Sequence, residues 1–405
     1  MFPTPQATDI YSRYMVEAFD ERNIIGVSTV WQQFFGKPEN GNSKTVLSTD
    51  DLTVDIDIAR ANERIAKLIH RGTNSRDLNT MSNTATQNFS SFTRRYPLAE
   101  ELGDITANQI NKRTIGEAPF AGKARAERLR LLAMEHHNEH IRRYVRLFEV
   151  LAGFSLLGGQ HPAITGALAG TDDWYDFRRN AAHLITPAVP WNAAAADILG
   201  DIDAGCRILR QNGKVSPNVL FLGQDVWGPF IRNLDILTKA DVRRFELVEV
   251  NKGAVMPASL QPLVNGGAIF RGVLTTPEGW TIYLFSYVDI FTDDDGNVQH
   301  YMPLDSAFLA YYGARCDRYF GPPEILPVTS MENAWYREML GIDMMTPVMP
   351  AGIKNMAGTV IPQMFYCDAY QSADRKKVTI RTQSAPIFAT TQTDAFLTFT
   401  KVLGV

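Results

Sequence analysis

The segment His136-His137-Asn138-Glu139-His140 contains the residue types and the spacing of a zinc site. On a helix His136 and His140 share one face, as two metal ligands must, and Glu139 between them can polarise a metal-bound water. The pattern H-x-x-E-H occurs in one class of zinc proteases. One hypothesis is therefore a metal-dependent hydrolase built on His136, Glu139 and His140.

The alternative interpretation of this segment is structural. A five-residue string is a weak signal, because a catalytic zinc needs a third protein ligand and an organised cleft. The helix face that carries His136 and His140 continues into Tyr144 and Phe148, a pattern typical of a packing surface. We therefore expect no catalytic residue, no metal ligand and no cofactor, and we predict that the chain is not an enzyme.

A second metal-like motif is the acidic run Asp293-Asp294-Asp295-Gly296-Asn297. Placing Gly296 at the sixth position of a calcium loop puts Phe291 at the first position and Met302 at the twelfth, where oxygen ligands are needed. A hairpin turn is the expected structure. A loose calcium site between subunits stays open as an alternative.

The composition argues against several classes of protein. The 405 residues carry a formal net charge of -4, so no overall basic field favours binding of nucleic acid. The cysteines Cys206, Cys316 and Cys367 share no motif spacing, which argues against a disulfide framework. The sequence shows no signal peptide and no apolar run of roughly 18 residues, so we expect synthesis in a cytoplasm without membrane insertion.

The elements that position these residues follow from hydrophobic periodicity. Val54 to Ile58 alternates strictly and predicts a strand, and a long helix is predicted from about residue 123 to 157. Further predicted elements are a helix at 193–211, a buried strand at 218–223, a helix at 225–233, hairpin strands within 268–291, an apolar strand at 307–314, and closing strands at 377–382 and 396–402. The pattern indicates an α+β class.

Residues 70–111 are polar and aperiodic but retain Phe89, Phe92 and Tyr96. A structureless segment of about 40 residues is uncommon within a compact domain. We expect a two-stranded arm whose aromatic side chains lie outside their own subunit's core and pack on a neighbour. A disordered loop is the alternative, although disordered segments are usually poor in aromatics. Residues 1 to about 50 likewise predict an extended arm without a packed core.

The order of short motifs along the chain is informative, although no single motif is specific. The motifs are Val54–Ile58 with Arg60; Ile105-Thr106; Arg113 and Gly116-Glu117; the Arg- and Glu-rich helix ending in Leu157-Gly158-Gly159; Trp191 with Asp197; Asn218–Gly223 with Phe230 and Asn233; Gly267–Tyr283; and Ser384-Ala385-Pro386. Over roughly residues 50 to 400 this order resembles the lambda-type major capsid protein E family of tailed bacteriophages.

The resemblance implies the α+β fold of tailed-phage major capsid proteins (the Johnson-type fold). The expected parts are an N-terminal arm (1–53), an extended loop region (54–117), a peripheral domain with a long spine helix (118–190, closed by strands from the C-terminal part), an axial domain (191–390), and a return strand to the peripheral domain (391–405).

The resemblance also implies a function. The expected protein is a major capsid protein of the virion, assembled in the host cytoplasm into hexamers and pentamers of an icosahedral head around double-stranded DNA. Its expected partners are copies of itself, a decoration protein, a portal, and DNA contacted weakly and non-specifically. A separate scaffold protein is expected, because the residues before Val54 are too interrupted by Pro and Gly for a fused helical scaffold. The subunit-interface candidates are Arg71, Arg76, Phe89, Phe92, Arg94, Arg95 and Tyr96.

The type of bond between neighbouring subunits is a separate question. Some relatives with this fold join neighbours by an isopeptide bond from a lysine on the extended loop. No lysine occurs between Lys67 and Lys112, and the arginines there are permanently charged and cannot replace it. The sequence therefore predicts a non-covalent contact between subunits.

Overall fold

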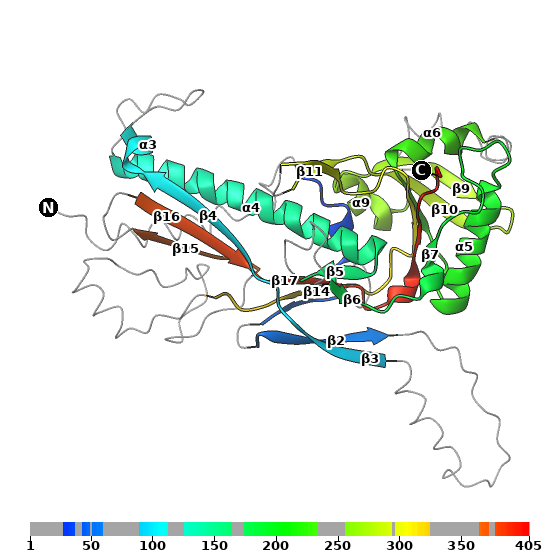
Figure 1. Ribbon diagram of the computed structural model, residues 1–405, viewed down its shortest axis with the longest axis horizontal. Helices are drawn as coiled ribbons and strands as arrows, with labels where there is room; N and C mark the ends of the chain where they lie inside the picture. Colours follow the sequence, from blue (N-terminus) through cyan, green and yellow to red (C-terminus); the bar gives the residue numbers. More distant parts are fainter. Residues whose placement is uncertain are drawn as a thin grey trace, which may run out of the picture.

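The computed structural model describes residues 27–36, 43–48, 51–59, 89–111, 125–163, 174–233, 256–293, 296–324, 364–371 and 377–404. These residues form a long helix flanked by strands, a six-stranded sheet with its own helices, and a two-stranded ribbon (Figure 1). The ribbon lies below the long helix in the view of Figure 1.

Helix α4 (Arg125–Leu157) runs for 33 residues. At 1.5 Å per residue it is about 50 Å long. Ala, Leu, Arg and Glu dominate its sequence and Pro is absent, which favours an uninterrupted helix. Its buried face includes Ile141, Tyr144, Phe148 and Leu151, which confirms the predicted helix and its packing side.

The C-terminal end of α4 is buried, and other elements satisfy its carbonyl groups. The Arg179 guanidinium donates to Leu157 O at 2.9 Å and also to Leu156 O. The Thr398 hydroxyl donates to Leu157 O at 2.7 Å, and the Ser155 hydroxyl donates to Phe388 O at 2.7 Å. Free carbonyls at a helix end need such partners when water is excluded. These bonds fix the helix end against the strands that contain Phe388 and Thr398.

A three-stranded antiparallel sheet lies along α4. Its order is β15 (Tyr366–Gln371), β16 (Lys377–Ser384) and β4 (Ala99–Thr106), and the short helix α3 (Ala107–Asn111) follows β4. Ile105 and Ile380 pack with Leu132 of the helix. The Tyr144 hydroxyl donates to Thr382 O at 2.6 Å, so the sheet is held to the helix by apolar packing and a buried hydrogen bond.

The six-stranded sheet has the order β7 (Leu184–Ile185), β18 (Phe396–Phe399), β13 (Ala307–Ala310), β8 (Val219–Leu222), β10 (Thr281–Ser286) and β9 (Ile269–Thr275). Every residue of β8, β13 and β18 is buried, because both faces of the sheet are covered. Side chains of β8 alternate between two apolar clusters, Leu220 and Leu222 on one face and Val219 and Phe221 on the other.

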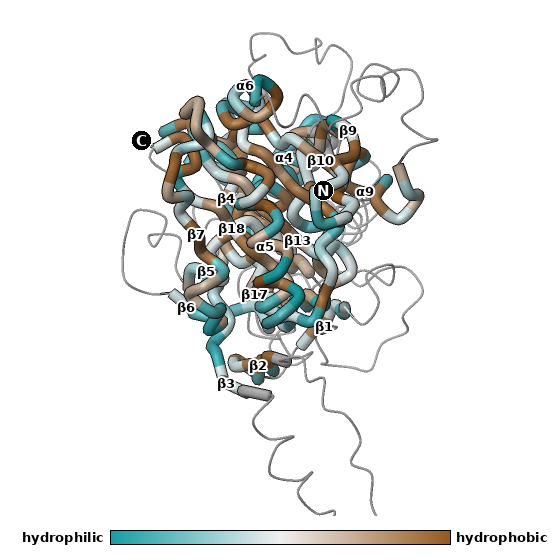
Figure 2. Tube along the Cα trace, turned by 90° about the vertical axis from the view of Figure 1, so that its right-hand side faces the viewer, coloured by the Kyte–Doolittle hydropathy of each residue, from teal (hydrophilic) through white to brown (hydrophobic). Residues whose placement is uncertain are grey.

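Different elements cover the two faces of this sheet. Helices α5 (Ile198–Asn212) and α6 (Gln224–Arg232) pack on the face of Leu220. Helix α4 and residues 27–36 pack on the face of Phe221. The hydrophobic stretches of the chain gather in the interior of the body around β10, β13 and β18 (Figure 2).

Residues 27–36 are part of the core, and we call them the N-terminal plug. They contain the short helix η2 (Trp31–Phe34), and the side chains of Trp31, Phe34 and Phe35 are 0% exposed. The Trp31 ring lies 5.0 Å from Phe221, and the Phe35 ring lies 5.2 Å from Phe388. The prediction of an unpacked arm is wrong for this segment, because the aromatics of one helical turn outweigh the surrounding Gly and Pro signals.

The remaining described elements are short. They are the sheet β1 (Thr45–Leu47), β14 (Asp317–Phe320) and β17 (Pro386–Ala389); the ribbon β2 (Thr53–Ala59) and β3 (Phe89–Arg95); the pair β5 (Gln160–Pro162) and β6 (Trp174–Asp176); the hairpin β11 (Ile290–Thr292) and β12 (Val298–His300); and the helices η6 (Ala181–His183), η7 (Ala258–Leu260), α9 (Gln261–Asn265) and η8 (Thr393–Ala395).

Two expected domain boundaries differ from the observed strand pairing. Residues 391–405 were expected to return to the domain of the long helix, but β18 pairs with β13 and β7 inside the six-stranded sheet. Conversely β15 and β16, within the expected range 191–390, pair with each other and with β4 beside α4. Local periodicity identifies strands, whereas their partners depend on contacts distant in the sequence.

Within the described residues, no helix has the length and hydropathy of a membrane span.

Candidate functional site

The ribbon of β2 and β3 is the part of the predicted interface that the structure describes best. Its strands pair in antiparallel register from Thr53–Arg95 to Ala59–Phe89. Side chains alternate across it, so that Ile56, Ile58 and Phe92 are buried, whereas Asp55, Asp57, Ser91, Thr93 and Arg95 are exposed. The ribbon therefore has one apolar face against the body and one polar face directed away from it.

The buried face of the ribbon packs on residues from distant parts of the chain. Phe92 and Tyr96 join a cluster with Phe177, Tyr319 and Ile387. The Phe92 and Phe177 rings lie 6.2 Å apart. Apolar burial of this kind, at about 25 cal/mol per Å², stabilises a two-stranded ribbon that would be marginal alone.

Cation–π contacts add to the attachment of the ribbon. The Arg94 guanidinium lies 4.6 Å from the centre of the Phe92 ring and 5.4 Å from that of Tyr175. The Tyr175 hydroxyl donates to Arg95 O at 2.8 Å. Each such cation–π contact contributes about 0.5–1 kcal/mol at a partly exposed site. Arg94 thus fastens the end of β3 to β6 of its own chain.

Tyr96 closes the apolar face at the junction between β3 and β4. Its backbone N–H donates to Leu52 O at 3.0 Å, and its ring lies against Gly321 so closely that no side chain fits there. Burial, together with the charge of Asp51, raises the pKa of Tyr96 to about 12. Tyr96 is therefore neutral and held within its own subunit.

The predicted interface residues fall into three groups. The prediction that Phe92 and Tyr96 lie outside their own subunit's core is wrong, because each is only 8% exposed within the single chain. At the ribbon end Arg94 is half-buried and Arg95 is exposed. Their contact with another subunit stays a prediction. Arg71, Arg76 and the side chain of Phe89 lie outside the described residues.

Within residues 70–111 the structure describes one strand of a ribbon, β3, and its partner β2 lies outside that range. The strands β2 and β3 pair as expected of an extended region. Residues 99–106, however, form β4 in the sheet along α4 and not a second part of the arm. Pro97 marks the change, because buried positions are even-numbered before it and odd-numbered after it.

The H-x-x-E-H segment lies on α4 facing β4 and β16. His140 is 2% exposed, and its Nδ1 lies 3.1 Å from the Thr382 hydroxyl oxygen. Burial, with the nearby charge of His136, lowers the pKa of His140 to about 4. Its ring also abuts Gly103 of β4. His140 therefore acts as a neutral packing residue between the helix and the sheet.

Glu139 is directed to a different set of partners. Its carboxylate lies 3.6 Å from the Arg143 guanidinium and 3.7 Å from that of Arg146, on the accessible side of the helix. Among the described residues, no group of three or more His, Cys, Asp or Glu side chains is arranged to hold a metal ion. The geometry thus favours the structural interpretation of this segment over the hydrolase hypothesis.

Asp293, Gly296 and Asn297, the described residues of the acidic run, lie in the connection of a hairpin, as the sequence predicts. Asn297 N–H donates to the Asp293 carboxylate at 2.7 Å, and Gly296 has a φ of +85°. β11 and β12 pair on either side of it. The positive φ explains why a glycine is needed at this position.

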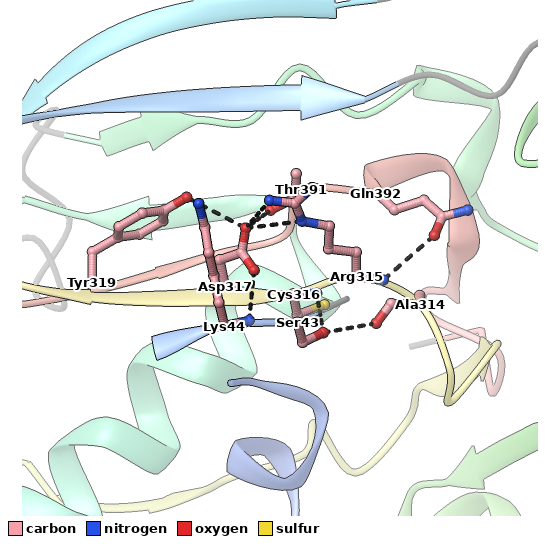
Figure 3. A network of polar contacts seen from close by, with 9 residues as sticks. All are labelled: Ser43, Lys44, Ala314, Arg315, Cys316, Asp317, Tyr319, Thr391 and Gln392. Atoms are coloured by element: carbon pink, nitrogen blue, oxygen red, sulfur yellow. Dashed lines mark hydrogen bonds and ion pairs between the residues drawn. The ribbon is translucent and has the colours of Figure 1, made fainter. Parts of the chain in front are cut away.

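A buried polar network that sequence reasoning missed lies at Asp317 of β14 (Figure 3). The Asp317 side chain is fully buried. Its carboxylate accepts hydrogen bonds from Lys44 N–H at 2.9 Å, from Arg315 Nε at 3.1 Å and from the Thr391 hydroxyl at 3.0 Å. One carboxylate thereby joins the residues before β1, the start of β14 and the segment after β17.

The neighbouring residues extend the network along the same strands (Figure 3). Cys316 N–H donates to the Ser43 hydroxyl oxygen at 3.0 Å, and Arg315 N–H donates to Gln392 Oε1 at 3.4 Å. These partners are 273 and 77 positions apart in the sequence. The network lies next to Tyr319, which packs under the ribbon, so it supports the surface on which the ribbon rests.

The family of the chain follows from comparison with known proteins. The sequence profile described as phage major capsid protein E matches residues 28–401. The chain belongs to this family. Its role is therefore that of a capsid protein of a bacteriophage. A search of curated proteins finds no match.

Several solved structures are similar to this chain at low sequence identity. A structure described as the capsid protein of a prophage of E. coli CFT073 has a TM-score of 0.57 and 13% identity, over 97% of this chain and 98% of that chain. The capsid of Ralstonia phage GP4 has a TM-score of 0.42 and 12% identity over 90% and 87%. A phage-related protein of Bordetella bronchiseptica RB50 has a TM-score of 0.47 and 10% identity over 97% and 96%. The first of these shows that this phage capsid protein has the tailed-phage capsid fold that the sequence predicts.

Proposed function

We propose that this phage capsid protein forms hexamers and pentamers of an icosahedral head that encloses double-stranded DNA. Membership of the major capsid protein E family over residues 28–401 is the observation that carries the proposal. Assembly takes place in the host cytoplasm around a separate scaffold protein. A portal and a decoration protein complete the head, and DNA is contacted weakly at its inner surface.

The shape of the subunit supports this role. The ribbon lies at the edge of the body beside β14 and β6 (Figure 1). Its polar face is directed away from the body. Asp55, Asp57 and Arg95 on that face are exposed. A polar surface that is attached to the body and directed outward is suited to contact with the next copy. Such heterologous contacts give a ring when they close on themselves. The ribbon end with Arg94 and Arg95 is the described part of this proposed contact.

Electron microscopy and mass photometry of the purified protein, alone and co-expressed with its scaffold, test the proposal. Hexamers, pentamers or closed shells are expected. A subunit that stays monomeric under all these conditions would contradict it.

A paired variant tests the ribbon contact separately. Asp55→Lys with Asp57→Lys reverses two exposed charges and should leave the circular dichroism spectrum unchanged while blocking assembly. Asp55→Asn with Asp57→Asn is the matched control, and a much smaller effect is expected because no charge is reversed. Normal assembly of the lysine variant would exclude the outward face of the ribbon as an interface.

A further inference from the structure

Glu149 of α4 holds the N-terminal plug with its carboxylate. Its Oε1 accepts hydrogen bonds from Trp31 N–H at 2.6 Å and from the Tyr287 hydroxyl at 3.0 Å. Its Oε2 accepts from Gln32 N–H at 3.1 Å and from Gln32 Nε2 at 3.2 Å. The Glu149 side chain is 0% exposed. The carboxylate therefore lies in the interior, and its contacts with Trp31 and Tyr287 are fully buried.

The carboxylate replaces a helix cap that the plug lacks. Trp31 and Gln32 are the first residues of η2, so their N–H groups have no acceptor within the turn, and no side chain of the turn caps them. Glu149 supplies both acceptors from another element. An acceptor that carries negative charge at the start of a helix is favourable. The carboxylate thus adds a polar attachment at the start of η2 to the aromatic packing that buries the plug.

No cation compensates the charge of Glu149 within the part of the chain that the structure describes. The titratable groups near it are Tyr287 and Tyr301, and Tyr301 in turn lies near the charges of Arg146 and Asp289. Arg146 pairs at the accessible surface with Glu139 at 3.7 Å. A buried carboxylate without a cation is costly to ionise. Burial accordingly raises the pKa of Glu149 to about 7, against the opposing effect of its hydrogen-bond donors.

The neutral acid also has a partner in this site. Backbone N–H groups and the Gln32 amide nitrogen can only donate, but the Tyr287 hydroxyl can rotate and accept the carboxyl proton. Tyr287 lies 3.0 Å from Glu149 Oε1, the distance of a hydrogen bond in either direction. The site therefore accommodates both protonation states without moving the plug far.

We propose that docking of the N-terminal plug against α4 is coupled to uptake of one proton by Glu149. With the plug undocked, water reaches the carboxylate and its ordinary pKa of 4.5 applies. Docking raises that pKa, so the docked state is favoured by protonation. Plug docking is strongest below about pH 4.5, weakens as the pH rises to about 7, and is constant above that value. The plug is thus a proton-sensitive fastening between the chain's N-terminal region and its long helix.

Hydrogen–deuterium exchange of unassembled subunits tests this coupling. Protection of the amides of residues 27–36, corrected for intrinsic exchange, should fall at least tenfold between pH 4.5 and pH 7 and then level off. Amides of α5 serve as an internal reference, because its buried side chains belong to the apolar cluster on the other face of the six-stranded sheet and not to that of the plug. In Glu149→Gln the protection of the plug should not change with pH, whatever its absolute level.

Two further variants keep the test decisive. Glu139→Gln removes a carboxylate from the accessible side of the same helix and should leave the pH dependence unchanged. Gln32→Ala removes a donor that favours the ionised acid, so the pH at which protection levels off should rise. Constant protection in the wild type, or the same pH dependence in Glu149→Gln, would overturn the coupling. The measurement needs no shell, so its failure would leave the proposed capsid assembly untouched.

Discussion

Gly103 of β4 lies directly against the imidazole of His140, so that a methyl group at position 103 would come within 3.0 Å of that ring. The ring cannot retreat freely, because it is buried and lies 3.1 Å from the Thr382 hydroxyl. This contact sets the distance between α4 and the sheet beside it. The H-x-x-E-H segment thus has a packing role that a glycine on the opposite strand makes possible.

Gly103→Ala should therefore destabilise the subunit. Overpacking a closely packed site costs about 1–3 kcal/mol. Urea denaturation followed by circular dichroism measures the free energy of unfolding. Asn108→Ala, at an exposed position of the short helix α3 that follows β4, is the control, and its stability should stay within about 0.5 kcal/mol of the wild type. Equal stability of the two variants would show that β4 lies farther from α4.

Asp317→Asn should weaken the joint between three distant segments. The substitution keeps the shape of the side chain but removes the charge that Arg315 and Lys44 N–H contact. Loss of hydrogen bonds to a buried charged group costs about 2 kcal/mol. The same denaturation measurement applies, and Asp289→Asn, at an exposed position, should leave the unfolding midpoint unchanged. An unaltered midpoint in Asp317→Asn would contradict the role given to this network.

Acidification should destabilise the subunit through two buried histidines. Burial lowers the pKa values of His140 and His161 to about 4, from 6.5. Because the folded-state pKa values are the lower ones, stability is fully present above about pH 6.5 and is lost as the pH falls to about 4.

The fully buried His161 allows this pH effect to be isolated. His161→Phe preserves stacking on Tyr175 and should gain about 2–3 kcal/mol relative to the wild type between pH 7 and pH 4. Gln160→Ala, at the exposed neighbouring position, should show no relative change. A difference between His161→Phe and the wild type that does not vary with pH would contradict the assignment.

Neighbouring subunits in assembled particles should separate without breaking a covalent bond. No lysine occurs between Lys67 and Lys112, so residues 68–111 of the extended loop region have no amine to form an isopeptide bond. Denaturing electrophoresis of mature particles should give one band near 45.3 kDa. Particles treated with a lysine-reactive crosslinker provide the positive control. A ladder of multimers that survives boiling without crosslinker would disprove the prediction.

The sequence predicted the elements that depend on local signals. The long helix, the buried strand β8 and the β9–β10 hairpin occur where periodicity and turn residues indicate them. Helix α5 begins at Ile198 and not at 193, because Asp197 caps it by accepting from Gly200 N–H at 2.9 Å. A capping residue thus fixed a boundary that composition alone placed five residues too early.

The contacts that the sequence did not predict join distant positions. Phe92 and Tyr96 are buried by Phe177 and Tyr319, which no local pattern connects to the ribbon. The partner of Glu149 lies 118 positions earlier, at Trp31. A charged residue within a helical stripe gives no indication that it is buried, because burial is decided by the segments that pack on it. The anchors of both the ribbon and the plug were therefore visible only in three dimensions.

The position of β18 in the middle of the six-stranded sheet has a consequence for synthesis on the ribosome. β18 lies between β7 and β13, and Phe396 on it packs 6.3 Å from Phe34 of the plug. The plug is synthesised before the strand that completes its surroundings, because that strand is made only after residue 395. A chain cut short before that point leaves aromatic side chains uncovered and is open to proteolysis. The core can therefore close only after β18 has been synthesised.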